Sequence, residues 1–231
     1  MFVTTSRALA VLAFAGAVLG SQGAAQASTT LVVGAAPTGT NVFPFGFSDG
    51  GSFYQQVYAA SDFASPISIS GLQFYAGADP VTVSNGVYTI SLSATAAAVD
   101  ALSTNPANNI GANDLQVFSD SIAQVVPGGG IMTLLFSQAF SYNPGAGNLL
   151  VNITIANQEF GFGGFLANNG DANGIFSRVT DFGGGYEGYG LETGFIVDTP
   201  AAVPEPATWA LLLGGFALAG VALRRRTAAL A

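Results

Sequence analysis

Residues 142–155 read YNPGAGNLLVNITI, and this stretch decides the fold class. Its second half has an apolar residue at every other position, at Leu149, Val151, Ile153 and Ile155. Successive side chains of a β-strand point to opposite faces of a sheet, so the alternation predicts a strand with one face on a core. The first half contains Asn-Pro-Gly, which are turn residues. We therefore expect a turn followed by a half-buried strand.

Comparable patterns recur along the interior of the chain. Strands are predicted over segments 67–75, 87–93, 115–118, 131–136 and 191–197. Segment 131–136 has apolar residues at both sets of alternating positions, so we expect it to be buried on both faces. Asn85-Gly86 is expected to form a tight hairpin turn.

Helical periodicity is scarce between these segments, and the chain contains 31 glycines. The alanine-rich segment 94–102 fits either a helical turn packed on a sheet or a strand end followed by a loop. Residues 105–113 are expected to form a loop. The pattern predicts an all-β fold, in which residues 28–202 form a single antiparallel β-sandwich of jelly-roll-like type.

The amino-acid composition excludes several kinds of chemistry. The 231-residue chain has no His and no Cys, and its five basic residues are all Arg. It therefore has no disulfide, no thiolate metal ligand, no Ser-His triad and no lysine Schiff base. We accordingly expect neither a cofactor nor a catalytic residue.

The charges are unevenly distributed. Arg7 lies near the start, and an arginine cluster lies near the end. Residues 28–203 contain one basic residue, Arg178, against twelve acids, which gives this segment a net charge of −11. Almost nothing in it neutralises phosphates, so nucleic-acid binding is excluded.

The first 27 residues have the organisation of a signal peptide. Arg7 supplies a positive charge, and an apolar run follows it over residues 8–19. Ala25 and Ala27 are small residues at the −3 and −1 positions, which predicts cleavage by signal peptidase before Ser28. The alternative is an N-terminal membrane anchor, but the apolar run is short for that purpose.

The last residues have the organisation of a membrane segment. Residues 207–223 are uncharged and mostly apolar, and as a helix they would span roughly 25 Å, near the lower limit for a bilayer. Arg224, Arg225 and Arg226 follow directly and are expected to stay in the cytoplasm. Together with the signal peptide, this predicts an exported domain held by a C-terminal transmembrane helix at 207–223.

The motif before this helix completes a tripartite pattern. Val203, Pro204, Glu205 and Pro206, an apolar helix and an arginine cluster over residues 203–231 resemble the PEP-CTERM sorting signal of bacterial exported proteins. The resemblance implies recognition and cleavage by an exosortase, in a Gram-negative bacterium that makes exopolysaccharide. The precursor is then anchored in the inner membrane, and the mature form lies at the cell surface or outside the cell. The alternative is a plain linker with a permanent anchor.

A glycine-rich segment offers a candidate carbohydrate site. Tyr186, Glu187 and Tyr189 combine aromatic rings with a carboxylate inside FGGGYEGYG, residues 182–190. Sugars stack on aromatic faces and hydrogen-bond to carboxylates. The alternative is a loop whose tyrosines fold back on the sandwich.

Asn169, Asp171 and Asn173 resemble the front of a calcium loop, with oxygen-bearing side chains at alternate positions before a glycine. The pattern is incomplete, because Thr180 occupies the twelfth position in place of Glu. The same residue types form ordinary turns. We therefore treat calcium as a weak alternative.

Three glutamates, Glu159, Glu187 and Glu192, are candidates for a glycosidase pair, which needs two carboxylates at a separation of roughly 5–10 Å. Most acids of an exported domain only solvate it. We therefore expect a non-enzymatic envelope or matrix protein associated with exopolysaccharide. A carbohydrate-binding module and a carboxylate-based glycan hydrolase or lyase are the alternatives.

Overall fold

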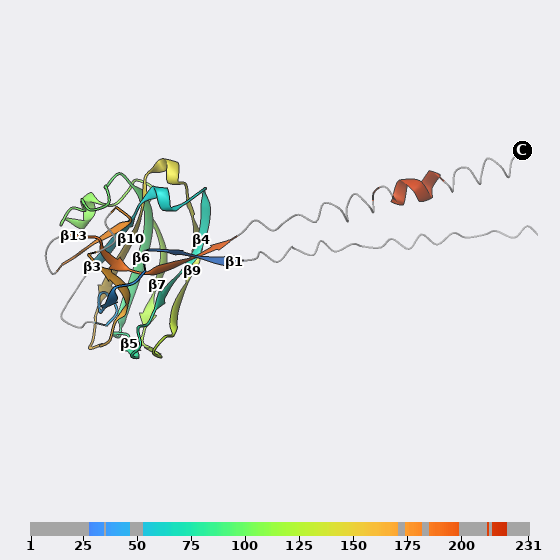
Figure 1. Ribbon diagram of the computed structural model, residues 1–231. Helices are drawn as coiled ribbons and strands as arrows, with labels where there is room; N and C mark the ends of the chain where they lie inside the picture. The colour runs from blue at the N-terminus through green and yellow to red at the C-terminus, as the bar shows by residue number, and fades with distance from the viewer. Residues whose placement is uncertain are drawn as a thin grey trace, which may run out of the picture. The chain divides into compact units, whose positions relative to one another are not determined.

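Antiparallel strands account for most of the chain between residues 28 and 198 in the computed structural model (Figure 1). The structure describes residues 28–34, 36–46, 53–170, 174–181, 185–198, 212 and 214–220, with the backbone alone at 185–187. Residues 26–200 form one compact unit, and residues 1–25 with 201–231 form a second.

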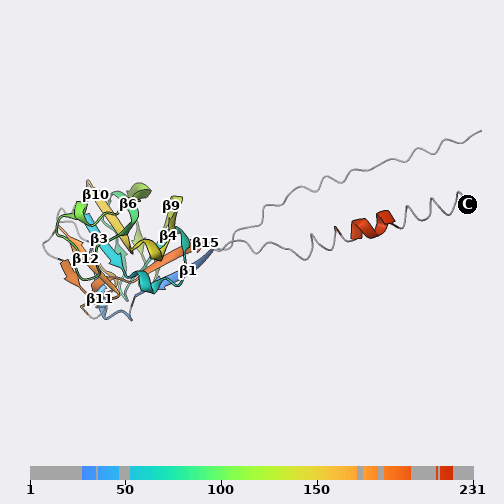
Figure 2. The ribbon, with the colours of Figure 1, turned by 90° about the horizontal axis from the view of Figure 1, so that it is seen from above.

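Two large antiparallel sheets dominate the first unit. The six-stranded sheet has the order β13 (Gly185–Glu187), β12 (Phe176–Thr180), β3 (Phe53–Tyr58), β10 (Asn148–Ala156), β6 (Gly86–Thr95) and β7 (Leu115–Ile122). The four-stranded sheet has the order β1 (Ser28–Val33), β15 (Thr193–Asp198), β4 (Ile67–Tyr75) and β9 (Ile131–Tyr142). Figure 2 shows β10 and β3 on one side of the unit and β4, β9 and β15 on the other.

Smaller elements complete the unit. One three-stranded sheet contains β14 (Tyr189–Leu191), β11 (Phe165–Asn169) and β2 (Gly39–Asn41), and a two-stranded sheet contains β5 (Val81–Thr82) and β8 (Val125–Val126). Three short 3-10 turns lie at Ala60–Asp62, Pro106–Asn108 and Pro144–Ala146. The all-β prediction is confirmed.

The two large sheets bury side chains in one hydrophobic core. Tyr58 of β3 meets Phe195 of β15 edge to face, with ring centroids 5.1 Å apart. Phe63 also packs edge to face against Phe195, at 5.7 Å. Such contacts between aromatic rings add to the free energy gained from burying their area.

The stretch that predicted the fold lies at the centre of the six-stranded sheet. Strand β10 pairs with β3 on one side and with β6 on the other. Leu149, Val151 and Ile153 are buried in the main core, as their alternation predicted. Leu150 on the opposite face is buried as well, in a second small cluster with Val57, Leu102 and Val179.

Two sequence predictions about strands are wrong. Segment 131–136 is not buried on both faces, because Ile131 and Leu135 of β9 are 53% and 66% exposed. Strand β9 is an edge strand, and only its Met132 and Leu134 face is covered. Asn85-Gly86 does not form a hairpin turn, because β5 pairs with β8 while β6 pairs with β7 and β10.

The loop after β6 covers the outer face of the six-stranded sheet. Strand β6 ends at Thr95, so residues 96–102 form a loop and not a helical turn. The side chain of Asn109 holds this loop and is almost fully buried. Its amide donates to Oε1 of Gln55 and to the carbonyl of Ser103, both at 2.8 Å, and its Oδ1 accepts from the Ser103 amide at 2.8 Å.

We expect Asn109→Ala to lower the free energy of unfolding by about 2–4 kcal/mol, because it leaves buried partners without hydrogen bonds. Asn108→Ala is the matched control, since Asn108 is exposed and bonds to the same Ser103 only at 3.3 Å. It should change stability by no more than about 0.5 kcal/mol. Urea unfolding of both variants measures the difference, and equal midpoints would contradict this role for Asn109.

The second unit is described only at Leu212 and residues 214–220, which are helical and exposed. Within the part of the chain that the structure describes, no helix is long and apolar enough to cross a membrane. The other residues of the helix predicted at 207–223 lie outside the described ranges.

Candidate functional site

Strand β12 carries Arg178, the one basic residue between positions 28 and 203. The side chain is 6% exposed, and its register partner on β3 is Gln56. Its guanidinium lies over the ring of Tyr189 at 5.6 Å and over the ring of Phe43 at 5.9 Å. It also hydrogen-bonds to the hydroxyl of Tyr54. Arg178 therefore joins three aromatic residues from different parts of the chain.

A buried polar network surrounds this arginine. The Tyr54 hydroxyl donates to Oε1 of Gln56. Gln56 in turn donates to the carbonyl of Leu191 at 2.9 Å and accepts from the amide of Leu191 at 2.8 Å. The Tyr58 hydroxyl donates to Oγ1 of Thr193 at 2.6 Å. The network thus fastens β3 to the end of β14 and to the start of β15.

Burial shapes the acid–base behaviour of these tyrosines. Desolvation raises the pKa of Tyr54 to about 12, although Arg178 and the Leu191 amide act in the opposite direction. Desolvation likewise raises the pKa of Tyr58 well above its usual value. Both hydroxyls are therefore protonated hydrogen-bond donors at neutral pH, which suits a structural role.

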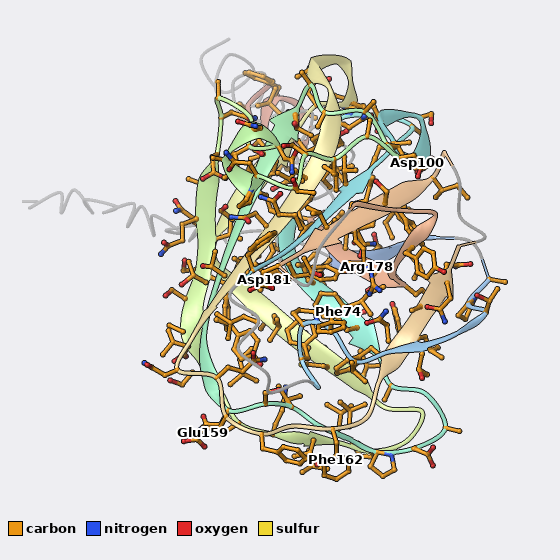
Figure 3. All side chains as sticks on the ribbon, turned by 90° about the vertical axis from the view of Figure 1, so that its left-hand side faces the viewer. Phe74, Asp100, Glu159, Phe162, Arg178 and Asp181 are labelled. Atoms are coloured by element: carbon orange, nitrogen blue, oxygen red, sulfur yellow. The ribbon has the colours of Figure 1, made fainter. Side chains whose placement is uncertain are left out.

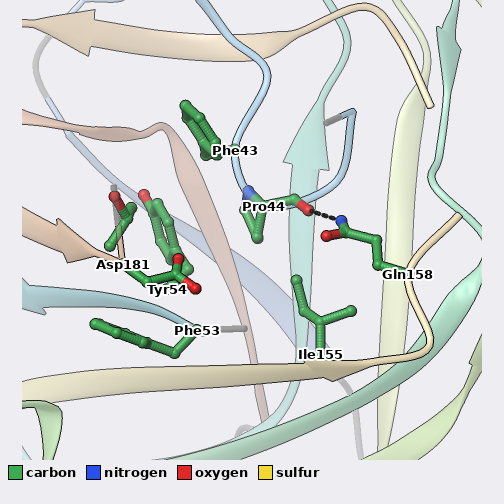
Figure 4. A pocket seen from close by; sticks show the side chains of 8 residues that line it. Phe43, Pro44, Phe53, Tyr54, Ile155, Gln158 and Asp181 are labelled. Atoms are coloured by element: carbon green, nitrogen blue, oxygen red, sulfur yellow. Dashed lines mark hydrogen bonds between the residues drawn. The ribbon is translucent and has the colours of Figure 1, made fainter. Parts of the chain in front are cut away.

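A small pocket opens beside this network (Figure 4). Its lining includes Phe43, Pro44, Tyr54, Ile155 and Asp181, and Gln158 closes one side by donating to the Pro44 carbonyl at 3.0 Å. The free space is about 10 Å³, close to the room needed by one water molecule. The pocket as it stands does not accommodate a sugar ring.

The candidate carbohydrate residues lie on two short strands. Tyr186 and Glu187 belong to β13, and their side chains lie outside the described part of the chain. Tyr189 begins β14 and is half-buried, with its ring against Arg178. This placement of Tyr189 fits the alternative in which the tyrosine folds back on the domain. A carbohydrate site at these three residues stays a prediction.

Sequence reasoning missed Asp100, which holds both candidate loops. Its Oδ1 accepts from the Gly188 amide at 3.0 Å, and its Oδ2 accepts from the Gly174 amide at 2.8 Å. Its own amide donates to Oγ of Ser177 at 2.9 Å. Asp100 has a positive φ of 65°, but this backbone conformation cannot be recognised from the sequence.

The calcium candidate is only partly described. Asn169 ends β11, and its amide donates to Oγ1 of Thr38 at 3.1 Å. Asp171 and Asn173 lie outside the described residues. Among the residues that the structure does describe, no group of three acidic, His or Cys side chains is placed to hold a metal ion.

The three candidate glutamates lie in different surroundings. Glu159 is exposed, accepts from the Asn85 side chain at 3.0 Å and lies at the lower end of the domain in Figure 3. Glu192 lies between β14 and β15, its amide donates to the Leu166 carbonyl, and burial raises the pKa of its carboxyl. The Glu187 side chain lies outside the described part. A catalytic pair of glutamates stays a hypothesis.

The two ends of the first unit lie side by side. Ser28, the first residue after the predicted signal-peptide cleavage, is the register partner of Asp198 at the end of β15. Four residues separate Asp198 from the motif that begins at Val203. The predicted signal-peptide residues Ala25 and Ala27, the motif residues 203–206 and the arginine cluster 224–226 all lie outside the described residues. The predicted signal peptide and the C-terminal motif therefore adjoin strand ends that are paired with each other.

Comparison with known protein families identifies the motif at the C-terminal end of the chain. Residues 202–226 match the PEP-CTERM protein-sorting motif. The chain carries a PEP-CTERM sorting signal. The match begins one residue before Val203 and ends at the last arginine of the cluster, so it includes all three parts of the pattern. No curated protein matches the chain.

A PEP-CTERM signal marks an exported protein that is made as a membrane-anchored precursor and sorted by an exosortase. The signal covers only residues 202–226 and indicates how the protein is sorted.

Proposed function

We propose that this chain is a non-enzymatic protein of the cell envelope or extracellular matrix of a Gram-negative bacterium, associated with exopolysaccharide. Signal peptidase removes residues 1–27, and an exosortase then cuts near Val203 to Pro206. The domain that is delivered to the cell surface is a jelly-roll-like β-sandwich. The match of residues 202–226 to the sorting motif carries this proposal.

The position of the two chain ends supports the proposed processing. Ser28 and Asp198 are paired at the ends of β1 and β15, and both predicted cleavage regions lie outside these strands. Removing both signals therefore breaks none of the strand pairings that the structure describes. The buried polar network supports a non-enzymatic role, because its groups bond to one another and to backbone and fix strands in place.

We expect the mature protein to begin at Ser28 and to lack the arginine cluster. An epitope tag inserted after Gly129, a turn glycine with open space around it, allows the protein to be followed in cell fractions. Intact-mass measurement on protein from wild-type cells should give the shortened form, and exosortase-deleted cells should retain the longer form in the membrane fraction. The same mass and location in both strains would refute the processing.

Substitution of the motif provides a matched pair for the same assay. Pro204→Ala with Pro206→Ala removes the two residues that restrict the backbone of the motif, and should cause the longer form to accumulate. Pro200→Ala, four residues earlier, is the control and should be processed normally. Normal processing of the double variant would argue against recognition of this motif.

A further inference from the structure

Two exposed phenylalanines lie next to each other on the surface of the domain. Phe160 and Phe162 are 73% and 55% exposed, and their ring centroids lie 6.3 Å apart. Large apolar side chains that are held together in solvent often mark an interaction surface. The pair therefore requires an explanation that the sorting signal does not supply.

The backbone of this segment is fixed to the strand beside it. The amide and the carbonyl of Phe162 both bond to Thr82 of β5, at 3.0 and 2.9 Å, and the Glu159 amide donates to the Asn85 carbonyl at 2.7 Å. Gly161 separates the two phenylalanines in the sequence and faces the domain, where an added Cβ would come within 2.5 Å of Ser84 Oγ. The two phenylalanines are two positions apart on an extended segment, so both point outward from a fixed backbone.

The neighbouring strands extend this surface. Thr82 pairs with Phe162 on one side and with Val125 of β8 on the other, so the three side chains share one face. Val125 is 64% exposed, whereas its neighbour Val126 is buried. Beside them lies an open groove of about 360 Å³, lined in part by Phe160, Val125, Asn85 and Gln124. This volume lies within the range of small-ligand sites.

The polar groups of the groove are neutral. Asn85 and Gln124 contribute carboxamides and Thr82 contributes a hydroxyl, and such groups both donate and accept hydrogen bonds. One charged group is bonded to a residue of the groove: the carboxylate of Glu159 accepts a hydrogen bond from the side chain of Asn85. Arg178 is the only basic residue of segment 28–203, and it is buried. A partner that depends on anionic groups would thus find no cation here, and a second copy would bring the same charge of −11.

We propose that this groove and the Phe162 ring beside it bind a chain of neutral sugars, with Phe160 and Phe162 stacked on sugar faces and Asn85 and Gln124 bonded to hydroxyls. The choice of a secreted glycan among hydroxyl-rich ligands rests on the proposed function. The site is distinct from the Tyr186, Glu187 and Tyr189 loop. Figure 3 shows Phe162 at one end of the domain and Asp100, which bonds to that loop, at the other.

The test uses the full-length chain purified in detergent, so it does not depend on export or cleavage. The probes are a neutral β-glucan, a neutral α-glucan and the acidic polysaccharide alginate, each cast in a native gel that retards a binding protein. We expect at least one neutral glucan to retard the chain, and alginate to bind it about tenfold more weakly or not at all.

Three variants locate the site. Phe160→Ala with Phe162→Ala should weaken binding about tenfold or more, since each aromatic face that stacks contributes strongly to affinity. Phe160→Tyr with Phe162→Tyr keeps both rings and should keep binding within about threefold. Leu135→Ala removes an equally exposed apolar side chain on β9 and should leave binding unchanged.

Several results would overturn the proposal. These are no retardation by either neutral glucan, equal binding of the alanine double variant, or stronger binding of alginate. Sedimentation that showed a dimer dissolved by the alanine double variant would assign the surface to a second copy. If the chain did not bind glycans but was cleaved normally in cells, the glycan site would be refuted and the sorting route would stand. If it bound glycans but was not cleaved, the sorting route would be refuted and the glycan site would stand.

Discussion

The purified protein is expected to keep an almost constant free energy of unfolding from about pH 6 to pH 10 and to unfold steeply above pH 10. The chain has no His, no Cys and no Lys, so between the carboxyls and the tyrosines only the terminal amino group titrates. Four buried tyrosines, Tyr54, Tyr58, Tyr88 and Tyr142, have a raised pKa because burial disfavours the phenolate.

The direction follows from proton linkage. Below pH 10 these tyrosines are protonated in both states, and their contribution to stability is fully present. Above pH 10 the unfolded chain releases protons that the folded chain keeps until about pH 12, the pKa of Tyr54 and Tyr142, so stability falls as pH rises. One pKa unit corresponds to about 1.4 kcal/mol, so tyrosines with a raised pKa together carry a large fraction of the stability of many domains.

Urea unfolding at intervals from pH 6 to pH 12, read by circular dichroism and by tyrosinate absorbance, measures this profile. Tyr142→Phe removes one hydroxyl, whose bond is to the Gly147 carbonyl, and should make the alkaline slope shallower by up to about 1.4 kcal/mol per pH unit. A marked loss of stability between pH 7 and pH 9 would contradict the assignment.

Gln56→Ala is expected to lower the free energy of unfolding by about 3–5 kcal/mol. The Gln56 side chain is 1% exposed and satisfies both the amide and the carbonyl of Leu191. It also accepts from the Tyr54 hydroxyl. Truncation leaves these buried groups without partners and opens a cavity between β3 and β14, and both effects destabilise the folded state.

Gln138→Ala is the matched control for this variant. Gln138 donates one hydrogen bond to a backbone carbonyl, that of Gln116, but it is exposed on β9. Its truncation should change the free energy of unfolding by no more than about 0.5 kcal/mol. Chemical denaturation of the two variants under identical conditions makes the comparison. If Gln56→Ala cost less than about 1 kcal/mol, the network would not be a main support of the fold.

The strands could be predicted because alternation is a local property. The β10 pattern from Leu149 to Ile155 appears in the sequence and in the sheet alike. Exposure of Ile131 and Leu135 could not be predicted, because it depends on which element covers the outer face of β9. Asn85-Gly86 was misassigned for a related reason, since the two segments that it joins belong to different sheets.

The candidate sites also differ in how far they could be predicted from the sequence. The sorting signal could be read directly, because motif, apolar segment and arginines follow one another in the chain. Asp100 bonds to residues 74 and 88 positions away, and no local pattern indicates such contacts. Phe160 and Phe162 have the spacing of core residues in a strand, and only the fixed path of the segment along Thr82 shows that they face solvent.

The pairing of Ser28 with Asp198 has a mechanical consequence. Strand β15 leads to the sorting motif and is hydrogen-bonded on both sides, to β1 and to β4. Hydrogen bonds between antiparallel strands lie perpendicular to the strand direction. A force applied along β15 from its carboxyl end therefore shears two ladders at once, and their bonds share the load. A domain pulled by this end would therefore resist unfolding through many hydrogen bonds that are loaded together.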